Sequence, residues 1–89
     1  MPSYLVESYI ADSATAVADA RDRARRTAQL GAGVRWVRTT FVPGDETVLH
    51  LFEAPSAAEL GAAGRRAELS FERIVEAVEG SADFGEEER

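Results

Sequence analysis

The sequence predicts one small α+β domain made of four strands and two helices. Short runs rich in β-branched and aromatic residues alternate with two alanine-rich segments, and turn-forming residues stand between most of them. The chain has 89 residues, which suits a single domain, and its 45% of hydrophobic residues is ordinary for a globular protein. We therefore expect a folded domain over residues 1–79 and an acidic, disordered tail over residues 80–89.

The first part of the chain is predicted to form a strand, a helix and a second strand. Residues 3–10, SYLVESYI, alternate in the way of a strand. Asp12 and Ser13 then offer an N-cap for a helix that extends to Leu30, and Gly31 is placed to end it. Residues 34–42, VRWVRTTFV, are dense in the β-branched and aromatic residues that strands favour.

The next segment is predicted to complete an antiparallel hairpin. Residues 43–45, Pro-Gly-Asp, have the composition of a tight turn. Residues 47–54, TVLHLFEA, then resume the strand pattern, and so short a connection joins antiparallel neighbours.

A second helix and a last strand follow. Ser56 and Glu59 form a capping box for a helix that extends to about Ala67, and residues 71–78, FERIVEAV, are predicted to form a strand. The order strand-helix-strand-strand-helix-strand is that of the ferredoxin-like fold, a four-stranded antiparallel sheet with both helices on one face.

Both faces of the predicted sheet carry apolar side chains, and two helices can cover one face. The other face would leave an apolar patch that soluble monomers rarely expose. We therefore expect a homodimer packed sheet against sheet, as in dimeric α/β-barrels. Periodicity does not show which set lies under the helices. One set is Tyr4, Val6, Val34, Trp36, Val48 and Phe52, and the other is Leu5, Val37, Phe41, Leu49 and Leu51.

Charge and composition exclude several classes of function. A net charge of −6 argues against a general nucleic-acid partner, which needs a basic surface. The basic residues are all arginine, so lysine-based covalent chemistry is excluded, and without cysteine neither disulfides nor thiolate metal ligands can form. No signal sequence and no membrane-spanning run is evident, so we expect a cytoplasmic protein without a membrane partner.

His50 is the leading candidate site residue. It is the one histidine of the chain and stands between Val48 and Phe52 on one face of a predicted central strand. Such a histidine can be a general base, a metal ligand or a polar anchor for a small molecule. The alternative is a core or interface histidine whose hydrogen bonds are satisfied.

Glu7 is the second candidate because it interrupts an otherwise apolar strand. A buried carboxylate is costly unless it is paired, so Glu7 is a candidate general acid/base or metal ligand. The alternatives are an ion pair with an arginine such as Arg38 or Arg73, or exposure at the end of the sheet. Three aromatic residues are candidates for lining a pocket, with the hydrophobic core as the alternative: Tyr4, Trp36 and Phe52.

Four segments together resemble a small, largely uncharacterised bacterial family of ferredoxin-like domains that is described as nickel-binding-protein-like. These segments are the opening YLVE, the strand GVRWVRTTF, the junction FEAPSAAEL and the closing RRAELSFERIVEAVE. The resemblance extends to about Glu79 and implies the fold and dimerisation. It also implies a divalent transition metal such as nickel as the first ligand to test, and no other cofactor.

The chain departs from the family pattern at several positions. The family typically has cysteine in place of His50 and often histidine in place of Ala63, and it tends to have Gly-Leu-Pro where residues 68–70 are Glu-Leu-Ser. A metal would therefore have His50, and Glu7 beside it, as its candidate ligands.

Two functions from different classes follow as hypotheses. The first is a small-molecule or divalent-metal binding protein with a site on the sheet face or at the dimer seam. The second is a cofactor-free enzyme of the dimeric α/β-barrel type, a monooxygenase, cyclase or isomerase, in which His50 or Glu7 would abstract a proton from an apolar aromatic or polyketide-like substrate. A purely structural role for the dimer face is a third possibility.

Overall fold

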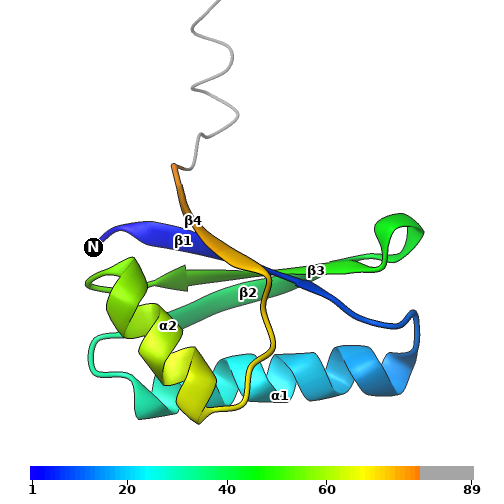
Figure 1. The fold of residues 1–89 in the computed structure, drawn as a ribbon, viewed down its shortest axis with the longest axis horizontal. Coiled ribbons are helices and arrows are strands. Elements are labelled where there is room, and N and C mark those ends of the chain that lie inside the picture. The colour runs from blue at the N-terminus through cyan, green and yellow to red at the C-terminus, as the bar shows by residue number, and fades with distance from the viewer. Residues whose placement is uncertain (79–89) are drawn as a thin grey trace, which may run out of the picture.

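The computed structural model describes residues 1–78, and the predicted tail over residues 80–89 lies outside them. The elements follow the predicted order (Figure 1). They are β1 (Ser3–Tyr9), α1 (Ala14–Leu30), β2 (Arg35–Val42), a single 3₁₀ turn (Pro43–Asp45), β3 (Thr47–Glu53), α2 (Ala57–Arg66) and β4 (Arg73–Ala77). The ferredoxin-like α+β fold is thus confirmed.

The four strands form one antiparallel sheet in the order β2-β3-β1-β4. Both helices lie on the same side of this sheet, and no element of residues 1–78 covers the other side (Figure 1). We call these two sides the helix face and the open face. β3 and β1 are the central strands, so side chains on their helix face lie between the sheet and the helices.

The register of the sheet corrects one face assignment. Trp36 is opposite Phe52, but a bulge between Trp36 and Arg38 shifts the pairing, so that Thr39 is opposite His50 and Phe41 opposite Val48. Because an extra residue reverses the alternation of side chains, Phe41 lies on the helix face with Trp36 and not on the open face. The other members of the first predicted set that lie in strands remain together on the helix face.

The helix ends follow their predicted caps. The Ser13 hydroxyl accepts from the N–H of Ala16, and the Ser56 hydroxyl accepts from the N–H of Glu59. Gly31 ends α1 with an extended backbone rather than a left-handed one. A Cβ at Gly31 would come within 2.6 Å of Val34 Cγ2 and 2.8 Å of the Ala63 Cβ on α2, so close packing against both residues requires glycine there.

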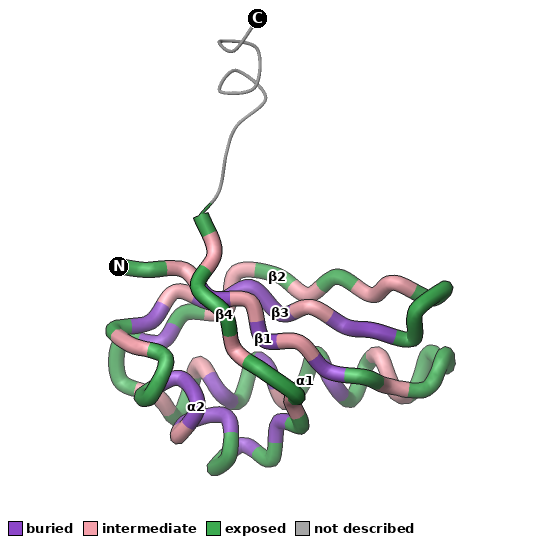
Figure 2. Tube along the Cα trace, turned by 45° about the horizontal axis from the view of Figure 1, so that its top comes forward, coloured by how far each residue is buried: buried purple, intermediate pink, exposed green. Residues whose placement is uncertain are grey.

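The core lies between the sheet and the helices (Figure 2). Buried residues gather along β3 and on the sides of α1 and α2 that face it, whereas β4 is largely exposed. β4 begins at Arg73 and not at Phe71, because Phe71 packs against the core instead of joining the ladder. The buried cluster comprises Tyr4, Val6, Ala24, Val34, Phe52, Ala54, Leu60 and Leu69.

Candidate functional site

His50 lies in the middle of β3 on the helix face, where its side chain is fully buried. It is opposite Val6 of β1 on one side and opposite Thr39 of β2 on the other. Its imidazole therefore sits between the two neighbouring strands, beneath the helices. A polar ring at such a position requires hydrogen-bond partners.

One ring nitrogen of His50 has a partner and the other has none. The Thr39 Oγ1 lies 2.7 Å from His50 Nδ1 and also accepts a 2.9 Å hydrogen bond from Trp36 Nε1. His50 Nε2 is buried, and no group in residues 1–78 forms a hydrogen bond with it. Since Nδ1 is held by β2, we infer that Nε2 is on the side of the ring that faces away from β2.

His50 is neutral at physiological pH. Burial disfavours the charged imidazolium and lowers the pKa of His50 to about 4. The neutral ring carries one proton. If that proton is on Nδ1, the Thr39 hydroxyl accepts a hydrogen bond from it; if it is on Nε2, the hydroxyl donates to Nδ1. His50 Nε2 is then either an acceptor or a donor, and in both cases it lacks a partner among the described residues.

A cavity of about 240 Å³ adjoins His50 between the sheet, α1 and the segment that joins α2 to β4. His50 is one of its lining residues, and none of them comes from β2, the strand that holds Nδ1. Its walls combine apolar groups from Ile10, Ala16, Ala20 and Leu69 with the polar groups of Ser8 and Ser70. The Ser8 hydroxyl donates to the Ser70 carbonyl, which fixes the α2–β4 segment against β1.

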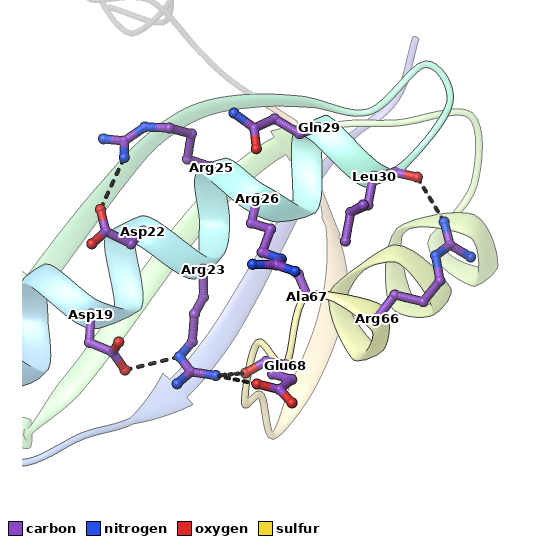
Figure 3. Close-up of a pocket in the computed structure, with 10 residues that line it drawn as sticks. All are labelled: Asp19, Asp22, Arg23, Arg25, Arg26, Gln29, Leu30, Arg66, Ala67 and Glu68. Carbon is purple, nitrogen blue, oxygen red and sulfur yellow. Dashed lines mark hydrogen bonds and ion pairs between the residues drawn. The ribbon is translucent and has the colours of Figure 1, made fainter.

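Arg23 is one of the residues that line this cavity, and it contacts two neighbouring segments (Figure 3). Its guanidinium bonds to Asp19 at 2.9 Å on α1 and to the backbone carbonyl of Glu68 at 2.8 Å. The Glu68 carboxylate also lies 3.5 Å from it. Arg23 thereby ties α1 to the α2–β4 segment, at a residue, Glu68, whose backbone is left-handed with φ 61°.

The same three charged residues, Asp19, Arg23 and Glu68, also border a wider groove that is rich in arginine (Figure 3). Arg25 in that groove pairs with Asp22 at 3.0 Å, and Arg66 donates to the Leu30 carbonyl at the end of α1. These pairings favour a structural role for the groove, because the protein itself engages Arg23, Arg25 and Arg66.

The structure does not bring Glu7 and His50 together. Glu7 follows Val6 in β1, so it lies on the open face, whereas His50 lies on the helix face. The Glu7 carboxylate pairs with Arg73 on β4 at 3.1 Å, which is one of the two ion pairs named above as its alternative role. Glu7 and His50 therefore do not form one metal or acid/base site within a single chain.

The three aromatic candidates lie apart from the cavity. Tyr4 and Phe52 belong to the buried core, and Trp36 packs against it from the neighbouring strand. The Arg25 guanidinium lies 5.7 Å from the centre of the Trp36 ring. All three aromatic side chains thus belong to the hydrophobic core or pack against it, which is the alternative to lining a pocket. Trp36 also contributes to the site through its hydrogen bond to Thr39.

Sequence reasoning missed the residues that surround His50. Thr39 could not be paired with His50 because the bulge near Val37 sets the register. A signal for Ser8 was present, since it shares its strand face with Tyr4 and Val6 and a polar residue there is unusual. Asp19 and Arg23 have the spacing of a solvated ion pair on a helix, and that spacing gives no sign of the second contact that Arg23 makes with Glu68.

The described residues of one chain offer few ligands for a metal ion. Among residues 1–78, no group of three or more His, Cys, Asp or Glu side chains is arranged to hold an ion. The two carboxylates that line the cavity together with His50, those of Asp19 and Glu68, are both paired with Arg23. No helix in this part of the chain is long and apolar enough to cross a membrane.

Fold and site together define a ferredoxin-like domain with a histidine-lined cavity beneath its sheet. The chain belongs to the family described as nickel responsive protein SCO4226-like, whose sequence model matches residues 4–77. This confirms the family resemblance found in the sequence.

A solved structure shows the same fold. It is titled as a crystal structure analysis of SCO4226 from Streptomyces coelicolor A3(2), and the two chains are 16% identical with a TM-score of 0.73. The match covers 89% of this chain and 99% of the other, so the solved structure supports the fold of the whole domain. No curated protein matches the sequence significantly.

Proposed function

We propose that this protein binds a small molecule in the cavity beside His50. Two observations carry the proposal: the buried Nε2 of His50 has no partner among residues 1–78, and His50 is one of the residues that line a cavity of about 240 Å³. An unpaired buried polar atom costs about 1–3 kcal/mol. A ligand that hydrogen-bonds to Nε2 would remove this cost, so the ring is poised to recognise one.

The rest of the site supports binding rather than proton abstraction. Trp36 and Thr39 hold the imidazole in one orientation, as a recognition group requires. Burial lowers the pKa of His50 to about 4, which makes the ring a weak base at neutral pH. The aromatic side chains expected to line the pocket of an enzyme, those of Tyr4, Trp36 and Phe52, are not among the residues that line the cavity.

A divalent transition metal is a second candidate, favoured by the description of the family. A neutral imidazole is the form that ligates metal ions. One histidine does not make such a site, and the carboxylates of Asp19 and Glu68 are held by Arg23. Residues 1–78 of one chain therefore do not supply the ligands that such a site needs.

We propose further that the chain forms a homodimer through the open face. Leu51, Leu5 and Val75 lie opposite one another on adjacent strands and form an apolar row across this face. Ion pairs flank the row on both sides, Arg35 with Glu53 at 2.9 Å and Glu7 with Arg73 at 3.1 Å. An apolar centre with a charged rim is the composition of many protein interfaces.

Native mass spectrometry of the untagged protein, purified without chelator, tests both functions. An organic molecule bound to wild-type protein and lost in His50→Leu would support the small-molecule site. An added metal ion lost in the same variant would favour the second candidate instead. A protein that carries neither, and that binds neither a mixture of small organic compounds nor Ni²⁺ when they are added, would contradict both.

A further inference from the structure

We infer that the ligand of the His50 cavity is an uncharged, ring-sized molecule with one hydrogen-bonding group, an aromatic alcohol being the simplest example. This inference rests on the proposed function and adds the chemical class of the ligand. It is drawn from the charges around the cavity, from its volume and from the state of the His50 ring.

The inner end of the cavity offers no charge to a ligand. His50 is neutral there, and the Ser8 hydroxyl is already used in its bond to Ser70. An ionised carboxylate or ammonium group buried without a partner costs far more than an unpaired neutral group. The group that meets His50 Nε2 must therefore be an uncharged donor or acceptor, such as a hydroxyl or an amide.

The outer end of the cavity does not favour a charged ligand either. Arg23 is the cation nearest the opening, and its guanidinium is shared between Asp19 and Glu68. An anionic ligand would have to displace one of these partners, and it would approach a protein whose net charge is −6. A cationic ligand would find two carboxylates, but both are neutralised in part by Arg23.

The volume sets the size of the ligand. A cavity of about 150 Å³ in another protein binds benzene. The cavity beside His50 measures about 240 Å³, which leaves room for one six-membered ring with a short substituent. Ile10, Ala20 and Leu69 provide apolar contacts for such a ring while its polar group reaches His50.

Four compounds of nearly equal size test the inference: benzyl alcohol, toluene, benzoate and benzylammonium. Each is titrated into wild-type protein while the ¹⁵N-coupled imidazole signals are recorded by NMR, which report His50 alone because the chain has one histidine. We expect benzyl alcohol to bind about tenfold more tightly than toluene, the difference made by one hydrogen bond to a buried group. It should shift the Nε2 signal, and the two charged compounds should not bind.

Two variants complete the test. His50→Leu should bind benzyl alcohol no better than toluene, because the hydrogen bond is gone while the apolar walls remain. Thr40→Val is the matched control, since Thr40 is exposed on the open face and should leave all four affinities unchanged.

The outcomes distinguish a wrong ligand class from a wrong binding site. If benzoate or benzylammonium binds as tightly as benzyl alcohol, or if toluene does, the inferred class is wrong while the small-molecule site stands. If none of the four binds at millimolar concentration and the His50 signals do not move, the inference fails and the proposed site loses its main support.

Discussion

The Thr39 hydroxyl lies 2.7 Å from Nδ1 of His50, across the β2–β3 pair. The same oxygen accepts the indole N–H of Trp36, so one hydroxyl satisfies polar groups from two buried or half-buried rings. These two hydrogen bonds fix the orientation of the His50 ring and leave its buried Nε2 without a partner among residues 1–78.

Thr39→Val should destabilise the protein. Valine keeps the shape of threonine but leaves both Trp36 Nε1 and His50 Nδ1 without a partner, at a cost of about 1–3 kcal/mol. Urea unfolding followed by Trp fluorescence measures the change. Thr40→Val on the same strand is the control and should be close to neutral, because Thr40 is exposed. Equal stabilities for the two variants would show that the Thr39 hydroxyl contributes nothing.

His50→Leu should leave the free energy of unfolding unchanged or raise it by about 1 kcal/mol at neutral pH. Leucine removes a buried nitrogen that has no partner, and Thr39 keeps its bond with Trp36. The same urea experiment checks this. A residue that serves packing alone would give the opposite result, a loss of about 2 kcal/mol or more as for other core changes.

Stability should fall as the pH falls through the titration range of His50. The pKa of His50 is about 4 in the folded protein, whereas the ordinary value of 6.5 applies to the unfolded chain, which therefore takes up the proton first. Since the unfolded state binds more protons between these values, the free energy of unfolding decreases from about pH 6.5 to pH 4, by about 3 kcal/mol in total. Above pH 6.5 this residue contributes no slope.

The matched measurement compares wild-type protein with His50→Leu over the same pH range. Carboxylates that titrate in this range act on both proteins, so the difference between the two curves isolates His50. Parallel curves would mean that the pKa of His50 is close to its ordinary value and that the ring is not buried as described.

Arg23→Gln should expose His50 to reagents. Arg23 holds the α2–β4 segment through the carbonyl and carboxylate of Glu68, and its loss should let that segment open more often. Diethyl pyrocarbonate acylates neutral imidazole, so we expect His50 to react several-fold faster in the variant. Arg21→Gln, on the same helix but outside the cavity lining, is the control. Equal rates in Arg23→Gln and wild type would show that Arg23 does not limit access.

Val75→Asp should convert the expected dimer into a monomer. Val75 lies at the end of the apolar row on the open face and is 36% exposed, so an aspartate there can be solvated in the monomer but not in the interface. Sedimentation velocity of the variant and of Thr40→Ser, a mild change on the same face, measures the masses. A wild-type protein that sediments as a monomer at all concentrations would contradict dimerisation through this face.

Much of the fold was predictable because its signals are local. Ser13 and Ser56 cap helices with their own neighbours, and the hairpin of β2 and β3 is set by the turn between them. The candidate His50 was also predictable, as the one histidine within an apolar strand. Glu7 was recognised as an unusual residue, and its pairing with Arg73 required the β1–β4 register.

The sequence by itself determined the order of the elements, their caps and the family. The tertiary structure alone decided which face the helices cover, which residues meet His50 and where the cavity lies. Side chains alternate between the two faces of a strand, so the sequence does not show which face the helices cover. One bulge in β2 reverses this alternation and moves Phe41 to the helix face. The walls of the cavity come from β1, β3, α1 and the α2–β4 segment, which are far apart in the chain and which only packing brings together.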